Sequence, residues 1–366
     1  MTAPGAVVHV LPFDLSRGAQ IYAREICDAL DSPEQRHVIL TLFEGVDSVL
    51  GQADSLGVPR GRLRTIGFDP RVAVRLRRHL ARTRPSAVVA YGSEPFLYVA
   101  MAAPRATPIV YYRIGVSLDS LRTSPQRYLY RLLARRAGLV AGMSQEALDD
   151  AHDVMGVPEG RLRLVLNGRD PARFEQPRTE ADAAKGRARR LIWVGHLGAG
   201  KRPEWFIDAV AELRRRGLAV TASLVGDGPQ LERCVTPARA AGVELLGRRD
   251  DVAQLLAAAD IFCFTSDGEN EGLPGVLIEA SMARAAVVAT DVAGARTIVA
   301  DGETGLIVPP TSFQRYVDAL AELVADPARV AQMGEAGRVR CVEAFGVERS
   351  AEQWRGVLGE LIGVPA

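Results

Sequence analysis

The chain has 366 residues, of which 48% are hydrophobic and 24% are charged, and its formal net charge is +1. This length suits about two ordinary domains and excludes a single small one, and the composition excludes a disordered chain. With so balanced a charge, we expect no nucleic acid among the partners of the protein.

The first half of the chain alternates short apolar runs with amphipathic stretches, which is the pattern of strands and helices in turn. A helix is predicted over Ile21–Leu30. Strands are predicted at Ala6–Leu11, His37–Leu42, Ala87–Tyr91, Ile109–Tyr112, Leu139–Ala141 and Leu162–Leu166.

A basic segment, residues 60–84, contains nine arginines and has Asp69 as its only acid. A solvated helix face is the common explanation for such a run. The alternative is that residues 71–82 form a basic amphipathic helix that touches an anionic membrane. The apolar residues of this helix equally suit packing on a sheet: Val72, Leu76 and Leu80.

The second half repeats the alternation after a polar joint at residues 171–189. A final helix is predicted over Val347–Ile362, and strands at Leu191–Val194, Val220–Val225, Val243–Leu246, Ile261–Phe264, Val287–Thr290 and Leu306–Val308. Such alternation favours parallel sheets covered on both faces. We predict an α/β protein of two doubly wound domains, residues 1–177 and 188–346, with segment 347–366 as a candidate to pack back on the first.

Ligands of open α/β sheets bind beyond the carboxyl ends of the strands, so two facing sheets predict a cleft between the domains. Two strand-end loops contain glycines that would let the backbone approach a ligand: Gly18 before a helix, and Gly226 in the Gly-Asp-Gly-Pro run at 226–229. Each also suits an ordinary turn, and the GxGxxG spacing of a dinucleotide site is missing.

A third loop, Gly195–Lys201, matches the G-x-x-x-x-G-K pattern of a P-loop. Arg202 occupies the place of the Ser or Thr that would hold magnesium, and Pro203 suits the start of the next helix, so we reject that interpretation. Lys201 is one of only two lysines beside 43 arginines, which favours a specific need for a compact ammonium group. We predict that Lys201 neutralises a diphosphate without a metal ion.

The most specific loop is Asp267–Ser281, in which Glu271 precedes a predicted helix and Glu279 lies in its apolar run. If that helix begins near Pro274, Glu279 lies about 7–8 Å along its axis. A diphosphate at the positive end of the helix would then lie between two carboxylates, which accept hydrogen bonds from sugar and ribose hydroxyls. This arrangement suits a nucleotide sugar, whereas a solvated loop acid and a surface helix acid are the alternatives.

Together these residues resemble the retaining glycosyltransferases of family 4, whose GT-B fold sets two Rossmann-like domains across a cleft. The resemblance covers nearly the whole chain, with its most specific blocks towards the C-terminus. It runs through Ser16–Gln20, Leu166–Asp170, the loops at Gly195 and Gly226, Glu271–Glu279 and Asp301–Pro309.

The resemblance implies that Lys201 stabilises the departing diphosphate, that Glu271 binds the transferred sugar and that Glu279 binds the donor ribose. In such enzymes the leaving phosphate is thought to take the proton of the acceptor, so the resemblance implies no metal, cofactor or carboxylate nucleophile. Further donor contacts are expected from Gly18, Gly195, His196, Arg202, Gly226, Leu273, Pro274 and Gly275.

Three positions depart from the family pattern. Arg17 stands where the first of two loop glycines is common, and His196 stands where an arginine is common. Arg113 lies in the loop that often holds a catalytic histidine. We expect Arg17 and Arg113 on the acceptor side, and His196 beside Lys201 and Glu271 among the catalytic residues.

We therefore predict a retaining hexosyltransferase that uses a UDP-sugar, or alternatively GDP-mannose, and a small-molecule, glycan or lipid-linked acceptor. The alternatives are a nucleotide-sugar epimerase and a two-domain sugar or nucleotide-sugar binding protein without transfer. The four cysteines form no disulfide pattern and the first residues lack a signal peptide, so we expect a cytoplasmic protein, with peripheral contact at the inner membrane face as an alternative.

Overall fold

The computed structural model describes residues 5–14, 18–45, 50–51, 53–59, 68–114, 126–175, 187–268 and 271–363. The chain forms two compact units. The first runs to Gly168 and resumes at Val347, and the second is Arg169–Gly346. Within the described ranges, no helix has both the length and the apolar character needed to cross a bilayer.

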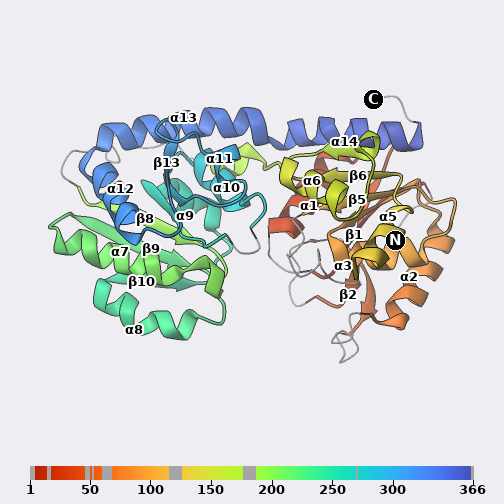
Figure 1. The fold of residues 1–366 in the computed structure, drawn as a ribbon, viewed down its shortest axis with the longest axis horizontal. Helices are drawn as coiled ribbons and strands as arrows, with labels where there is room; N and C mark the ends of the chain where they lie inside the picture. Colours follow the sequence, from red (N-terminus) through yellow and green to blue (C-terminus); the bar gives the residue numbers. More distant parts are fainter. Residues whose placement is uncertain are drawn as a thin grey trace. The chain divides into compact units, whose positions relative to one another are not determined.

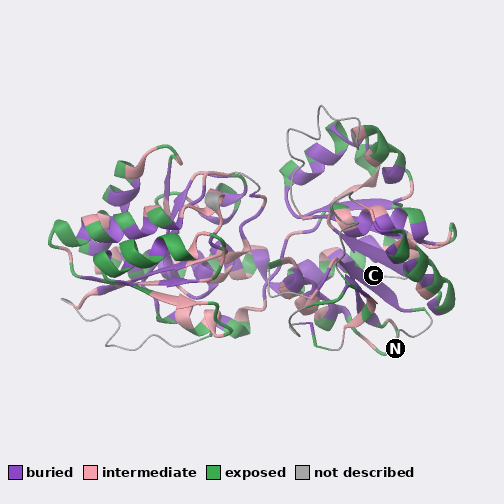
Figure 2. Cartoon of the chain, turned by 90° about the horizontal axis from the view of Figure 1, so that it is seen from below, coloured by how far each residue is buried: buried purple, intermediate pink, exposed green. Residues whose placement is uncertain are grey.

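The first unit is built on a parallel sheet with the strand order β3-β2-β1-β4-β5-β6-β7 (Figure 1). Every residue of β1, β4, β5 and β6 is buried, as expected for a sheet covered on both faces (Figure 2). The strand order reverses its direction between β1 and β4. The strands are β1 Val7–Leu11, β2 His37–Phe43, β3 Asp54–Val58, β4 Ala87–Tyr91, β5 Ile109–Arg113, β6 Leu139–Gly142 and β7 Leu162–Leu164.

Helices from both ends of the chain cover this sheet. Helix α14, Val347–Ile362, returns to the first unit and packs beside α1, Gly18–Leu30. The other elements are α2 Pro70–Thr83, α3 Ser93–Ala102, α5 Gln126–Ala134, α6 Gln145–Asp153 and a 3-10 turn at Glu159–Arg161.

A buried chain of polar side chains holds α14 against this unit. Trp354 Nε1 donates a hydrogen bond to Tyr22 Oη at 2.7 Å, and Tyr22 Oη lies 2.7 Å from Ser350 Oγ. Ser350 Oγ donates to the carbonyl oxygen of Leu166 at 2.8 Å. Because buried polar groups are stable only when they are paired, this row of hydrogen bonds fixes the position of α14, in addition to the apolar packing of the helix.

Two buried histidines lie beside these contacts. His9 Nδ1 lies 2.8 Å from Tyr91 Oη, and His9 Nε2 lies 3.0 Å from His37 Nδ1. Burial lowers the pKa of His9 well below its ordinary value, with a smaller contribution from His37. Burial also lowers the pKa of His37, to about 4, although nearby Asp31 raises it.

We expect the free energy of unfolding to be highest above pH 6.5 and to fall as the pH drops towards 4. In that range the unfolded chain binds protons that these buried histidines do not bind in the folded protein. For His37 alone, a pKa lowered from 6.5 to about 4 corresponds to about 3 kcal/mol. Urea unfolding across this range measures the effect, and His37→Asn should flatten the profile; identical profiles in both proteins would contradict it.

The second unit has a parallel sheet of the same winding, with the order β10-β9-β8-β11-β12-β13 and a reversal between β8 and β11. This confirms the prediction of two doubly wound α/β sheets. Its strands are β8 Arg189–Val194, β9 Val220–Val225, β10 Val243–Gly247, β11 Ile261–Phe264, β12 Ala286–Thr290 and β13 Gly305–Val308. Its helices are α7 Pro203–Arg215, α8 Leu231–Ala241, α9 Val252–Ala258, α10 Gly275–Met282, α11 Ala295–Ile298, α12 Phe313–Ala325 and α13 Pro327–Phe345.

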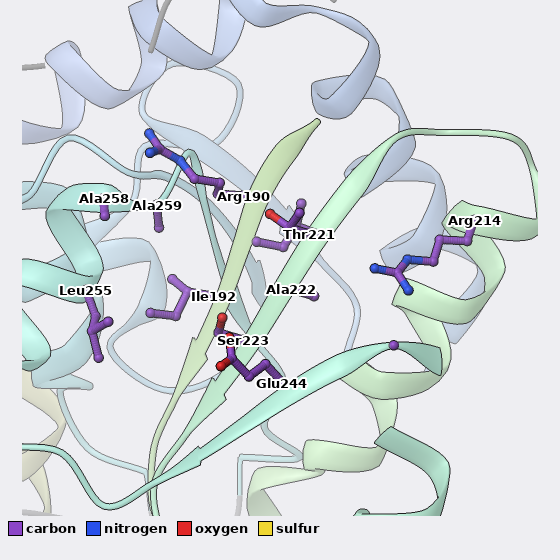
Figure 3. A pocket seen from close by; sticks show the side chains of 12 residues that line it. Arg190, Ile192, Arg214, Thr221, Ala222, Ser223, Glu244, Leu255, Ala258 and Ala259 are labelled. Atoms are coloured by element: carbon purple, nitrogen blue, oxygen red, sulfur yellow. The ribbon is translucent and has the colours of Figure 1, made fainter. Parts of the chain in front are cut away.

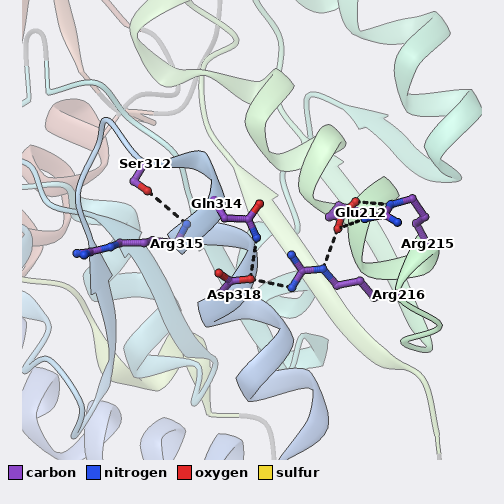
Figure 4. Close-up of polar contacts among 7 residues, drawn as sticks. All are labelled: Glu212, Arg215, Arg216, Ser312, Gln314, Arg315 and Asp318. Carbon is purple, nitrogen blue, oxygen red and sulfur yellow. Dashed lines mark hydrogen bonds and ion pairs between the residues drawn. The ribbon is translucent and has the colours of Figure 1, made fainter.

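Charged side chains join α7 and α12 at the surface of this unit (Figure 4). Glu212 accepts hydrogen bonds from Arg215 and Arg216 at 2.7 and 2.8 Å, and these contacts lower the pKa of Glu212 to about 2. Arg216 also donates to Asp318 on α12 at 2.8 Å. Ion pairs on a protein surface contribute little to stability. We therefore attribute the packing of α7 on α12 mainly to the buried apolar faces of the two helices.

The boundary between the two units lies earlier in the chain than predicted, and the apolar residues of the basic segment are buried. Pro171–Phe174 forms a 3-10 turn that belongs to the second unit, and Phe174 is buried there, so the first unit ends before residue 177. In α2 the apolar residues of the basic segment are buried in the core: Val72, Leu76 and Leu80. The apolar face on which a membrane contact of α2 would depend is thus occupied by the protein itself; residues 60–67 lie outside the described ranges.

Candidate donor site

Apart from Gly226, which follows β9, the predicted site residues of the second unit come after the two strands at which the sheet reverses its order. Residues 195–202 follow β8, and residues 265–268 and 271–274 follow β11. The carboxyl ends of the strands at such a switch point are where open α/β sheets bind ligands. The topology thus brings both loops to the edge where a ligand is expected.

Lys201 and Glu271 form an ion pair across these two loops, with Lys201 Nζ donating to Glu271 Oε1. The Lys201 side chain is 36% exposed, and its Nζ lies 5.7 Å from the centre of the Phe264 ring. The Glu271 side chain is only 6% exposed. Two predicted catalytic residues, 70 positions apart in sequence, therefore meet as a buried carboxylate beside a cation that solvent reaches.

The end of β11 fixes the backbone around Lys201. Thr265 Oγ1 lies 2.9 Å from the carbonyl oxygens of both Lys201 and Arg202, and it accepts a hydrogen bond from Trp193 Nε1 at 2.9 Å. Two residues on, the Asp267 N–H donates to the carbonyl oxygen of Gly200 at 2.9 Å. These bonds join the two loops through their backbones, so the position of Lys201 depends on both.

Gly226 lies against the loop that leads to Lys201. Its φ is 137°, and a Cβ atom at this position would overlap the carbonyl oxygen of Gly195. Gly228, with φ 150°, would place a Cβ atom 2.7 Å from the carbonyl oxygen of Leu197. The Leu197 N–H donates to the carbonyl oxygen of Asp227 at 2.7 Å. Close packing of two loops thus accounts for both glycines, and a contact of Gly226 with a donor stays a prediction.

Helix α10 begins at Gly275, one residue after the predicted start, with Pro274 as its N-cap and Leu273 buried just before it. Its amino end presents backbone N–H groups and a positive dipole, a combination that favours an anion. Glu279 lies one turn along the helix, and its side chain is 16% exposed. Its carboxylate accepts a hydrogen bond from Arg169 Nε at 2.7 Å, which accounts for an acid in this apolar run.

His196 and Arg202 differ in how much of their hydrogen-bonding capacity the protein already uses. The His196 side chain is half exposed, and its Nδ1 lies 3.8 Å from Asp227 Oδ1. Arg202 has a left-handed backbone with φ 46°, donates to the carbonyl oxygen of Pro310 at 2.6 Å and stacks on Trp205. The exposed His196 suits a ligand contact, whereas the Arg202 guanidinium already binds the protein.

The predicted donor contact Gly18 and the predicted acceptor-side residues Arg17 and Arg113 belong to the first unit. Gly18 is the exposed first residue of α1, and Arg17 lies outside the described residues. Arg113 is buried, and its guanidinium forms an ion pair with Asp150 and contacts Met155. Because its side chain is enclosed and its charge is paired, we correct the acceptor assignment of Arg113 and give it a structural role.

Sequence reasoning missed Arg169 and Thr265 as parts of this site. Arg169 lies in the Leu-Asn-Gly-Arg-Asp run at 166–170, which enters the sequence prediction only as a point of resemblance. Its side chain is fully buried against Glu279. The signal in the sequence is a single arginine in a strand-end run that also contains Asn167 and Asp170, and such a run does not identify the carboxylate partner that a buried arginine needs.

A surface pocket of about 380 Å³ lies elsewhere in the second unit, over β8, β9 and β10 beside α9 (Figure 3). Among the residues that line it, Arg190 comes from β8, Ser223 from β9 and Glu244 from β10. None of the predicted site residues lines it. The pocket is therefore separate from the loops that carry Lys201 and Glu271.

Two family models match the two halves of the chain. The model described as Glycosyltransferase Family 4 matches residues 16–173, and the model described as Glycosyl transferases group 1 matches residues 188–326. The chain belongs to glycosyltransferase family 4.

Curated relatives align with parts of the chain. The alpha-D-kanosaminyltransferase of Streptomyces kanamyceticus is 28% identical over 64% of this chain and 64% of its own length. A GDP-mannose-dependent alpha-(1-6)-phosphatidylinositol monomannoside mannosyltransferase of Mycolicibacterium smegmatis is 36% identical over 40% of this chain and 42% of its own length. The chain thus spans about two fifths to just under two thirds of these relatives.

Solved structures with the GT-B fold match both units together. HepE of Anabaena, in a crystal structure with UDP, superposes with a TM-score of 0.79 at 20% identity and covers 98% of this chain and 100% of that one. Sucrose-phosphate synthase from Thermosynechococcus elongatus superposes with a TM-score of 0.77 at 19% identity, over 98% and 99% of the chains. At this identity the likeness shows the fold alone, and it confirms the predicted fold class.

Proposed function

We propose that the protein is a retaining glycosyltransferase that moves a hexosyl unit from a nucleotide sugar to a hydroxyl acceptor. The observation that carries this proposal is the Lys201–Glu271 pair at the switch point of the second sheet, just ahead of the amino end of α10. A cation, a carboxylate and a helix dipole at one sheet edge match the diphosphate and the hydroxyls of a nucleotide sugar.

In this proposal Lys201 stabilises the charge that develops on the departing diphosphate. Its ammonium group is part exposed and its backbone is fixed by Thr265, so it is held in place before a donor arrives. Pre-oriented charge of this kind is a large contribution to catalysis. The amino end of α10 adds a second positive potential on the same anion.

The two carboxylates bind hydroxyl groups on either side of the diphosphate. Glu271 accepts hydrogen bonds from the transferred sugar. With a donor bound, Lys201 would contact both the Glu271 carboxylate and the diphosphate. Glu279 accepts from the ribose while its Oε1 keeps the Arg169 hydrogen bond. Ionised carboxylates are acceptors only, which suits them to diols.

The transfer proceeds on one face of the sugar ring. The bond between the anomeric carbon and the phosphate oxygen breaks, the acceptor oxygen bonds to the same face, and the acceptor proton passes to the leaving phosphate. Lys201 and α10 supply the positive charge, so we expect turnover to survive removal of divalent ions with EDTA. Loss of turnover in EDTA that Mg²⁺ or Mn²⁺ restores would contradict the metal-independent step.

A UDP-sugar is the donor that we propose first, and GDP-mannose is the alternative. HepE, which has the same fold, is solved with UDP and with UDP-glucose, whereas the mycobacterial relative is named as GDP-mannose-dependent. Thermal denaturation with UDP, GDP, UDP-glucose and GDP-mannose separates the two, because a ligand of the folded state raises Tm. Stabilisation without turnover with any acceptor would favour a binding protein, and interconversion of donor sugars would favour an epimerase.

Chemical labelling of amines tests where the donor binds. The chain has only two lysine side chains, Lys185 and Lys201. We expect an amine-directed ester to modify Lys201, and bound UDP or GDP to slow that modification at least about fivefold, because a phosphate would occupy the ammonium group. Peptide mass mapping reads both sites, and Lys185 serves as the internal reference. Equal labelling of Lys201 with and without a nucleotide that binds would place the diphosphate elsewhere.

A further inference from the structure

Arg169 is the first residue of the second unit, and its side chain is 0% exposed. Its Nε donates to Glu279 Oε1 at 2.7 Å, although the two residues are 110 positions apart. A fully buried guanidinium is stable only when it is paired and hydrogen-bonded. Because the buried Arg169 guanidinium needs a partner, it holds the Glu279 carboxylate in one position.

The backbone of Arg169 is fixed as firmly as its side chain. Its N–H donates to the carbonyl oxygen of Phe345 at 2.8 Å, and Arg169 forms an isolated parallel bridge with Gly346. Gly346 is the last residue of the second unit before the chain returns to the first. The two places where the chain passes between the units are thus bonded to each other, and Arg169 extends from them to α10.

Glu279 has one side that the protein holds and one that it leaves open. Its Oε1 is bound by a buried group, while 16% of its side chain remains exposed. A glutamate on a helix surface without such a partner samples several rotamers, and a ligand must then select one of them. The Arg169 contact removes that freedom before a ligand binds, which is the principle of a pre-organised site.

We propose that Arg169 is a positioning residue for the donor ribose, holding the Glu279 carboxylate in the orientation that accepts hydrogen bonds from the ribose hydroxyls. This inference rests on the proposed function, because it assumes a nucleotide at the second unit. Arg169 does not touch the donor; it acts through Glu279.

The test compares ligands with and without ribose hydroxyls. Calorimetry would measure binding of UDP and GDP, and of the 2′,3′-dideoxy form of whichever nucleotide the wild type binds. We expect Arg169→Met to weaken binding of the ordinary nucleotide by about tenfold, as for the loss of one well-placed hydrogen bond to a charged group. Binding of the dideoxy form should change less than about twofold. Arg169→Lys keeps the charge without the planar fork, so its affinity for the ordinary nucleotide should lie between those of the wild type and of Arg169→Met.

A conservative variant separates positioning from folding. Arg169→Lys keeps a positive charge next to Glu279 and leaves the Glu279 carboxylate intact, so it stays measurable even if Arg169→Met unfolds, and it should show the same selective loss to a smaller extent. Equal weakening of both nucleotides, or no change in either, would overturn the positioning role and leave the proposed function intact. A wild-type protein that binds neither UDP nor GDP would overturn the proposed function and this inference with it.

Discussion

Replacing Lys201 with methionine is expected to lower kcat by roughly 100- to 1,000-fold, while the dissociation constant of the donor changes by less than about tenfold. In the proposed mechanism the negative charge next to Lys201 grows as the phosphate leaves, whereas the amino end of α10 would also bind the diphosphate in the ground state. Steady-state kinetics, with calorimetry of nucleotide binding, measures the two effects separately.

Two further variants distinguish a loss of catalysis from a loss of stability in Lys201→Met. Lys201 pairs with Glu271, whose side chain is 6% exposed, so its removal leaves a buried carboxylate without its cation and lowers stability as well. Lys201→Met with Glu271→Gln removes that strain, and it should recover Tm without recovering kcat. The remote surface substitution Arg215→Ala should leave turnover unchanged. Wild-type kcat in Lys201→Met would remove Lys201 from the catalytic residues.

Substituting alanine for Gly226 is expected to destabilise the protein by about 4 kcal/mol or more, or to prevent folding. A Cβ atom would overlap the backbone oxygen of Gly195, and a φ of 137° is strained for any residue with a side chain. Since the two nearest atoms are the carbonyl oxygen and carbon of Gly195, which belong to the backbone, no rotamer change relieves the overlap. Urea unfolding or the yield of folded protein measures the loss.

Gly217 supplies the matched control for this substitution. It also has a positive φ, 78°, but a Cβ atom there would meet nothing within 4 Å. Gly217→Ala should therefore show only the backbone strain, about 1–2 kcal/mol. If the two variants were equally stable, the overlap with Gly195 would not be what requires glycine at 226.

Local patterns were sufficient for most of the fold. The strands Val220–Val225 and Ile261–Phe264 and the helix Val347–Ile362 lie where the apolar periodicity predicts them. Strand β3, Asp54–Val58, was missed because an edge strand that contains Gly57 and mostly half-buried residues carries no apolar run. The joint was placed too late because the packing of Phe174 under α9 and α10 is a tertiary contact.

The candidate site was predictable only where chemistry and sequence position coincide. Lys201 and Glu271 could be placed together because each follows a strand next to the reversal of the sheet. The burial of Arg113 against Asp150 and the pairing of Arg169 with Glu279 could not, because their partners lie 37 and 110 residues away. No local periodicity records such a pair, so a buried arginine and a ligand-binding arginine look alike in sequence.

The backbone contact between the loops at Gly195–Leu197 and Gly226–Gly228 has a consequence for re-engineering donor choice. Their atoms already touch, so neither loop has room for an insertion or a larger backbone of its own. Loops exchanged singly from a relative would collide with the resident partner, whereas both exchanged together would bring a matched surface. In this protein the two loops are one transplantable module.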